Sequence, residues 1–138
     1  MKNFSDSLIL VVDDNPSNLQ MIAKLLSYSG FKVKLAESGD KALKLIKEEI
    51  PDLILLDLVM PEMDGIEICR RVKSNPETKE IPVIFCTGNA ELKDMEKCFD
   101  AGGDDYTTKP IQSHLVFNRI QTHLELAALR KRYRDEQK

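Results

Sequence analysis

The stretch LILLDLVMP, residues 53–61, decides the fold of this protein. Four consecutive apolar residues, Leu53–Leu56, are followed at once by Asp57, and Pro61 ends the stretch. A short apolar run that ends in turn-forming residues is typical of a strand buried on both faces. Strands of this kind belong to parallel sheets that carry helices on both sides. We therefore predict a central parallel strand over Leu53–Leu56, with Asp57 at its carboxyl end.

Further apolar runs lie on either side of this one, and segments with helical spacing separate them. The predicted strands are Leu8–Val12, Phe31–Ala36, Leu53–Leu56, Ile81–Cys86 and Asp105–Thr108. Five helices are predicted between and after these strands. The first begins at Pro16, the second follows Ser38 as its N-cap, and the third follows Gly65. The fourth spans Ala90–Ala101, and the fifth begins near Gln112. Alternating strands and helices predict one α/β domain, a doubly wound five-stranded parallel sheet with helices on both faces.

The composition excludes several classes of protein. The chain has 138 residues, 42% hydrophobic and 31% charged, with a formal net charge of −3. Proteins that coat nucleic acids or membrane surfaces are strongly basic, so we expect neither activity. No apolar run is long enough to span a bilayer or to form a secretory signal. The three cysteines form no CxxC pair, which favours reduced thiols, a cytoplasmic location and no cysteine-bound zinc.

The carboxyl ends of the predicted strands carry the reactive side chains. Asp13 and Asp14 follow the first strand, Asp57 follows the third, Thr87 the fourth and Lys109 the fifth. In doubly wound sheets these ends form the ligand-binding edge. Carboxylates gathered there repel one another, and Mg²⁺ together with a lysine would offset that repulsion. A carboxylate nucleophile, a metal, a lysine and a hydroxyl are the parts needed for phosphoryl transfer, with Asp57 as the attacking group.

Each motif alone also has a plainer interpretation. Residues 13–16 could be only a turn and a helix cap, and Asp57 could simply begin a loop. Thr87 with Gly88 is a common turn opening, and Tyr106 could be a packing residue. The prediction of a phosphoryl-transfer site therefore rests on the combination of motifs.

Four blocks of the sequence closely resemble the receiver domains of two-component response regulators. The blocks are Ile9–Asn15, Pro51–Pro61 with Asp64–Gly65, Pro82–Thr87 and Gly102–Pro110. The resemblance covers roughly residues 7–124 and implies a flavodoxin-like sheet with the strand order 2-1-3-4-5. On this basis we expect a receiver domain over residues 1–124 and a C-terminal extension of the fifth helix, a linker or the start of a coiled coil, over residues 125–138.

The resemblance implies a phosphorylation site that uses Mg²⁺ as cofactor. Asp57 would be the phosphoacceptor. Asp14, Asp57 and the backbone carbonyl of Val59 would bind Mg²⁺ directly, and Asp13 would act mainly through water. Val59 and Asn89 would flank the water that attacks the phosphorylated aspartate. Because an apolar Val59 cannot orient this water, we predict slow loss of the phosphoryl group.

The resemblance also implies a conformational switch. Thr87 and Lys109 would hold the phosphoryl oxygens, and the Lys109–Pro110 peptide bond would be cis. Tyr106 would change rotamer with Thr87, so that the face formed by the fourth helix, fifth strand and fifth helix changes shape. The phosphodonor would be a histidine kinase or a histidine phosphotransfer protein, and the domain would catalyse only its own phosphorylation and dephosphorylation.

The C-terminal segment has two interpretations. Leu126, Leu129 and Tyr133 continue the helical spacing among basic residues, which fits either a solvated helix end or the start of a coiled coil. Homodimers through this helix, or through the face just described, are both possible. His123 is interpreted as structural.

Two alternative functions remain. One is a Mg²⁺-dependent phosphatase with an aspartyl nucleophile, although Val59 stands where such enzymes place a second acid. The other is a receiver-like interaction module that never carries phosphate.

Overall fold

The structure, a computed structural model, describes residues 6–88, 92–109 and 112–137, and in this part of the chain five strands alternate with five helices. The strands are β1 (Leu8–Val12), β2 (Lys32–Ala36), β3 (Leu53–Asp57), β4 (Val83–Thr87) and β5 (Asp105–Thr108). The helices are α1 (Pro16–Tyr28), α2 (Gly39–Glu48), α3 (Gly65–Ser74), α4 (Leu92–Asp100) and α5 (Ser113–Glu136). The strands are parallel in the order β2-β1-β3-β4-β5, which confirms the predicted fold.

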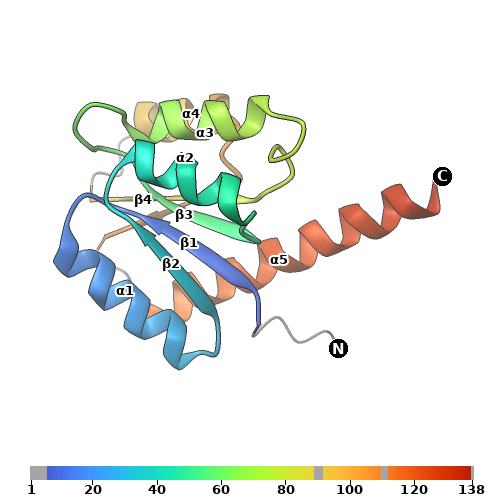
Figure 1. Ribbon diagram of the computed structural model, residues 1–138, viewed down its shortest axis with the longest axis horizontal. Helices are drawn as coiled ribbons and strands as arrows, with labels where there is room; N and C mark the ends of the chain where they lie inside the picture. Colours follow the sequence, from blue (N-terminus) through green and yellow to red (C-terminus); the bar gives the residue numbers. More distant parts are fainter. Residues whose placement is uncertain (1–5, 89–91, 110–111, 138) are drawn as a thin grey trace.

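Helices cover both faces of the sheet, α2, α3 and α4 on one side and α1 and α5 on the other (Figure 1). Successive residues of a strand point to opposite faces. Leu10 and Val12 of β1 therefore join the apolar cluster under α2–α4, whereas Ile9 and Val11 join the cluster under α1 and α5. This two-sided burial explains why the strand is apolar at every position. Each such side chain contributes about 1.5–3 kcal/mol when fully buried.

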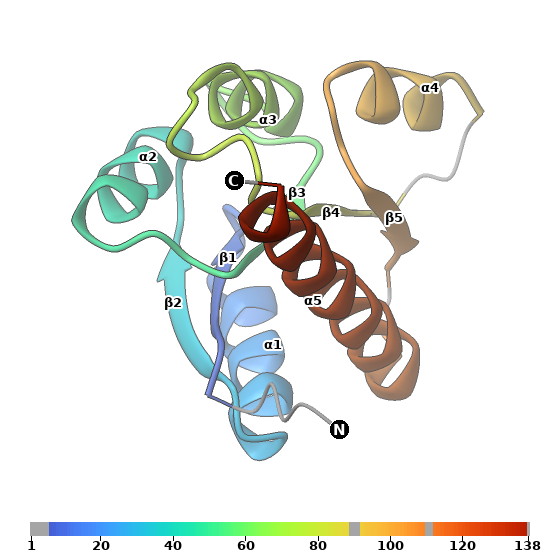
Figure 2. The ribbon, with the colours of Figure 1, turned by 90° about the vertical axis from the view of Figure 1, so that its right-hand side faces the viewer.

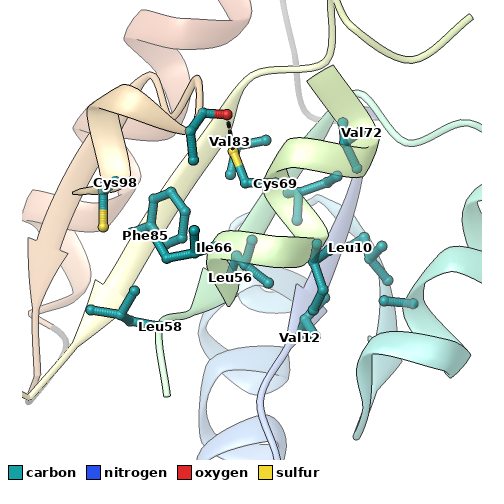
Figure 3. Packing of buried hydrophobic residues seen from close by; sticks show 14 of the residues in the cluster. Leu10, Val12, Leu56, Leu58, Ile66, Cys69, Val72, Val83, Phe85 and Cys98 are labelled. Atoms are coloured by element: carbon teal, nitrogen blue, oxygen red, sulfur yellow. Dashed lines mark hydrogen bonds between the residues drawn. The ribbon is translucent and has the colours of Figure 1, made fainter. Parts of the chain in front are cut away.

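Figure 3 shows the cluster between the sheet and α2–α4. The Cys69 thiol lies in it and donates a hydrogen bond to the carbonyl oxygen of Ala101, 3.4 Å away. Cys69, Cys86 and Cys98 are free and buried. Burial raises the pKa of the Cys69 and Cys86 thiols to about 12 and that of Cys98 to about 11, so all three stay protonated at neutral pH. The prediction of unpaired thiols is confirmed.

Some predicted boundaries differ from the structure for identifiable reasons. The prediction placed Phe31 in the second strand, but its N–H donates to the carbonyl of Leu26 at the end of α1. The prediction began the fourth strand at Ile81, but this N–H closes a turn on Thr78, so β4 starts at Val83. The predicted cap of α2 is confirmed, since the Ser38 hydroxyl accepts the N–H of Lys41. The first two residues of the predicted helix Ala90–Ala101 lie outside the described residues, and α4 ends at Asp100.

The last helix, α5, is a single element of 24 residues whose C-terminal part extends away from the sheet (Figures 1 and 2). It passes residue 124 without a break. Beyond that point Leu126, Leu129 and Tyr133 are exposed. Arg134 lies 3.5 Å from the carboxylate of Glu80. None of the helices in the described residues is long and apolar enough to cross a membrane.

Candidate functional site

The predicted acidic residues meet at the carboxyl edge of the sheet. Asp13 and Asp14 follow β1, and Asp57 is the last residue of β3. The parallel register of these adjacent strands pairs Val12 with Leu56, so both strands end at the same level. One carboxylate oxygen from each aspartate lies within 4.8 Å of the other two. We call this group the acidic pocket.

Lys109 brings the positive charge to the acidic pocket from the end of β5. Its ammonium nitrogen lies 2.9 Å from Asp13 Oδ2 and 3.4 Å from Asp57 Oδ1. Its backbone N–H donates to the carbonyl oxygen of Thr87 at 2.8 Å, which fixes the chain at this point. The lysine therefore bridges two of the three carboxylates.

The positive charge of Lys109 does not balance the negative charge of the three aspartates in the acidic pocket. Burial raises the pKa of Asp57 above its ordinary value, repulsion from Asp13 raises it further, and Lys109 only partly opposes these effects. Burial alone would lower the pKa of Lys109, but its hydrogen bond to Asp13 and the attraction of Asp57 raise it. The remaining negative charge and the all-oxygen donor set fit a hard divalent cation. The acidic pocket is thus able to hold a metal ion.

Asp13 and Asp14 differ in their surroundings although they are neighbours. Asp13 is buried, and its Oδ1 accepts the N–H of Asn15 at 2.9 Å. The Asn15 side chain in turn caps α1 by accepting the N–H groups of Ser17 and Asn18. Asp14 is exposed. The motif therefore serves both as a helix cap and as part of the pocket.

The loop after β3 holds Asp57 by a close backbone contact that the sequence reasoning missed. The N–H of Gly65 donates to the carbonyl oxygen of Leu58 at 2.9 Å. A Cβ atom at Gly65 would lie 2.2 Å from the carbonyl oxygen of Asp57. Glu62 of the same loop has a positive φ of 67°, unusual for a residue other than glycine. The signal available in the sequence was Asp64–Gly65 directly before a helix.

Thr87 of β4 and Tyr106 of β5 are diagonal neighbours on adjacent strands, since Tyr106 pairs with Phe85 and Thr87 with Thr108. Both side chains are buried. Burial is the main cause that raises the pKa of Tyr106, and a hydrogen bond with Thr87 opposes that rise. The side chain of Val59 is 73% exposed on the loop after β3. Asn89 and the Lys109–Pro110 peptide bond lie outside the described residues.

The fold and the acidic pocket define the class of protein. The profile of the response regulator receiver domain matches residues 9–121, which is most of the chain. The chain therefore belongs to the response regulator receiver domain family.

Similar proteins show how this domain occurs elsewhere. The chain is 41% identical over 125 residues to the Vibrio cholerae protein called "probable cyclic di-GMP phosphodiesterase", covering 91% of this chain and 28% of that protein. It is 37% identical over 114 residues to response regulator PleD of Caulobacter vibrioides, and the match covers 83% of this chain and 25% of PleD. The structure of the signal receiver domain of a Syntrophus aciditrophicus histidine kinase superimposes on this chain with a TM-score of 0.80 and 31% sequence identity. The match covers 86% of this chain and 90% of that chain. The chain thus spans roughly a quarter of the length of these two curated relatives.

Proposed function

We propose that this protein is a phosphorylation-controlled signalling switch of a two-component system. A histidine kinase or a histidine phosphotransfer protein donates a phosphoryl group to Asp57. The observation that carries this proposal is the convergence of Asp13, Asp14 and Lys109 on the Asp57 carboxylate. Bringing a phosphoryl group to a carboxylate requires positive charge close by, which Lys109 supplies and a bound divalent cation would supply.

The residues of the acidic pocket have different roles in the phosphoryl transfer. Asp14, Asp57 and the Val59 carbonyl hold Mg²⁺, with Asp13 acting mainly through water. When bound, Mg²⁺ supplies positive charge that neutralises the phosphoryl oxygens. An oxygen of Asp57 attacks phosphorus, and the bond between phosphorus and the donor's imidazole nitrogen breaks as the new P–O bond forms. The Lys109 ammonium attracts the transferred oxygens.

The signal then passes to the surface. The phosphorylated aspartate carries added charge and acceptor oxygens. The Thr87 hydroxyl turns toward them, and the contact between Thr87 and Tyr106 changes with it. The face formed by α4, β5 and α5 changes shape, and a partner or an output domain reads that change. In this proposal residues 1–124 are the receiver, residues 125–138 extend α5 as a linker, and the protein works in the cytoplasm.

The direct test is chemical phosphorylation. Acetyl phosphate with Mg²⁺ should add the mass of one phosphoryl group to the intact protein, and hydroxylamine should remove it because acyl phosphates are labile to that reagent. An unchanged mass at saturating acetyl phosphate would leave the interaction module as the better interpretation. The phosphatase alternative has no observation in its favour, because Val59 offers no acid for a leaving group.

Mg²⁺ should stabilise the fold through the acidic pocket. At about 100 times its dissociation constant, Mg²⁺ should raise the free energy of unfolding by about 3 kcal/mol, because the unfolded chain lacks the site. Asp14→Asn keeps the shape of the side chain and should lose most of this effect. Asp40→Asn, a change of an exposed carboxylate on α2, is the control and should respond like the wild type. Urea unfolding with Mg²⁺ or EDTA measures the difference, and an undiminished effect in Asp14→Asn would place the metal elsewhere.

Val59→Asn should shorten the lifetime of the phosphorylated state. An amide at this exposed position can orient the attacking water, which valine cannot. We expect hydrolysis to accelerate about tenfold, which is less than the roughly 10²–10⁴-fold effect of a general acid or base because an amide orients the water without taking its proton. The measurement is the decay of the phosphorylated mass after acetyl phosphate is removed. A variant that loses phosphate no faster than the wild type would refute this role.

We also propose that phosphorylation promotes a homodimer. The surfaces are the face formed by α4, β5 and α5, which carries the half-exposed Phe99 and Leu115, or the exposed apolar residues at the end of α5. Solution mass measured with and without beryllofluoride, a phosphoryl mimic, should show association only with the mimic. A monomer in both conditions would overturn the dimer proposal alone.

A further inference from the structure

A second polar cluster lies at the opposite end of β5 from Lys109. Asp105 is the first residue of β5. Its Oδ1 accepts the backbone N–H of Tyr106 at 2.8 Å and the Arg119 guanidinium at 2.6 Å. Its Oδ2 lies 2.8 Å from His123 Nε2, which carries the proton because a carboxylate only accepts. Asp105, Arg119 and His123 form what we call the Asp105 cluster, which joins the β5 backbone to two positions one turn apart on α5.

The Asp105 cluster is firmly held. Burial alone would raise the pKa of Asp105, but the Tyr106 N–H, His123 and Arg119 together lower it, so the carboxylate stays ionised at neutral pH. The His123 ring is buried, and its Nδ1 has no hydrogen-bond partner in the described part of the chain. The polar attachment of this ring is therefore to Asp105.

The Asp105 cluster lies on the opposite face of the sheet from the Tyr106 side chain. Successive strand residues face opposite sides of the sheet. Tyr106 packs in the apolar cluster under α2–α4 and contacts Thr87, whereas Asp105 faces α5. The Asp105 carboxylate binds the N–H of Tyr106 itself. A displacement of the Tyr106 backbone must therefore move the carboxylate or break its hydrogen bonds.

Apolar side chains also pack α5 against the sheet. Val116, Ile120 and Leu124 belong to the cluster that α5 shares with α1. Apolar contacts have no fixed direction, whereas hydrogen bonds require defined distances and angles. The Asp105 cluster therefore adds directional restraints on the position of α5 along β5 to the restraints from apolar packing.

We propose that the Asp105 cluster transmits a change at Tyr106 to α5, with Arg119 and His123 as positioning residues. The proposal rests on the proposed function, since phosphorylation supplies the change at Tyr106. In this proposal the change in the Tyr106 side chain is accompanied by a shift of the β5 backbone. The Asp105 carboxylate follows the N–H that it binds, and α5 follows through its two donors. The movement reaches the exposed part of α5, residues 125–136.

The test compares two regions of the full-length protein by amide NMR. Mg²⁺ and beryllofluoride are added, and shift changes are recorded around Asp57 and along residues 122–134. In the wild type both regions should respond. Asp105→Ala should keep the response around Asp57 and reduce the α5 response roughly twofold or more, the scale of coupling through such networks. Arg134→Gln removes a different ion pair of α5, the one to Glu80, and should respond like the wild type.

The outcomes separate the two proposals. An α5 response in Asp105→Ala equal to that of the wild type overturns the inference, even if the melting temperature falls, because the cluster would then be only structural. If Asp105→Ala does not fold, the double variant Arg119→Met/His123→Leu carries the same test, because it removes both α5 donors. A wild type that responds around Asp57 and not in α5 overturns the inference alone. A wild type that responds nowhere overturns the proposed function with it.

Discussion

Asp57→Ala should abolish phosphorylation by acetyl phosphate, leaving no mass shift under conditions that fully modify the wild type. Asp13 and Asp14 also lie in the acidic pocket, but Lys109 already engages Asp13, and Asp14 is exposed at its edge. Asp57 is the carboxylate at the end of a central strand, between these groups. Intact-protein mass spectrometry measures the effect. Asp40→Asn should remain fully modifiable, and a persistent mass shift in Asp57→Ala would assign the phosphoacceptor to another residue.

Without Mg²⁺, the same variant should be more stable than the wild type at neutral pH. Burial and repulsion from Asp13 raise the pKa of Asp57 above its ordinary value of 3.8. A raised pKa means that ionised Asp57 disfavours the folded state, so the wild type loses stability as the pH rises from the ordinary pKa of 3.8 towards the raised pKa. The free energy of unfolding of Asp57→Ala, measured in urea, should therefore exceed that of the wild type by more at pH 7 than at pH 4. A variant less stable than the wild type at pH 7 would contradict this account of the pocket.

Gly65→Ala should damage both the fold and the site. The new Cβ would lie 2.2 Å from the carbonyl oxygen of Asp57 and 3.1 Å from Leu58 Cα, so the backbone has to move. Overpacking of this kind costs about 1–3 kcal/mol, and here the displaced backbone carries the phosphoacceptor. We expect a lower urea midpoint together with slower phosphorylation by acetyl phosphate.

Gly88→Ala is the matched control for this prediction. A Cβ at Gly88 meets no atom within 4 Å, although the residue directly follows Thr87 at the same edge of the sheet. Its stability should change by no more than about 0.5 kcal/mol. Equal losses in the two glycine variants would show that the close contact at Gly65 is not the cause.

The secondary structure was largely predictable because its signals are local. The apolar run Leu8–Val12 and the cap at Ser38 were found from neighbouring residues alone. The errors at Phe31 and Ile81 arose where backbone N–H groups bind carbonyls of a preceding helix or turn. Such hydrogen bonds depend on the path of the chain, which hydrophobic spacing does not describe.

The acidic pocket was predictable in its members and not in its geometry. Parallel strands bring their carboxyl ends to one edge, so Asp13, Asp57 and Lys109 could be grouped from the sequence. Which carboxylate the lysine favours could not be predicted, because 2.9 Å to Asp13 and 3.4 Å to Asp57 depend on side-chain packing. His123 was interpreted from the sequence as structural, and nothing in the sequence pointed to Asp105 as its partner.

The order of apolar runs, turns and helical repeats in the sequence by itself determined the alternating α/β architecture and placed the reactive side chains at or next to the carboxyl ends of the strands. Only the tertiary structure decided that Gly65 lies against the Asp57 carbonyl, and that Arg119 and His123 bind Asp105. The physical reason is the separation along the chain of the groups that interact. Strand and helix formation respond to spacings of two to four residues, whereas these contacts need groups far apart in the chain to come within about 3 Å.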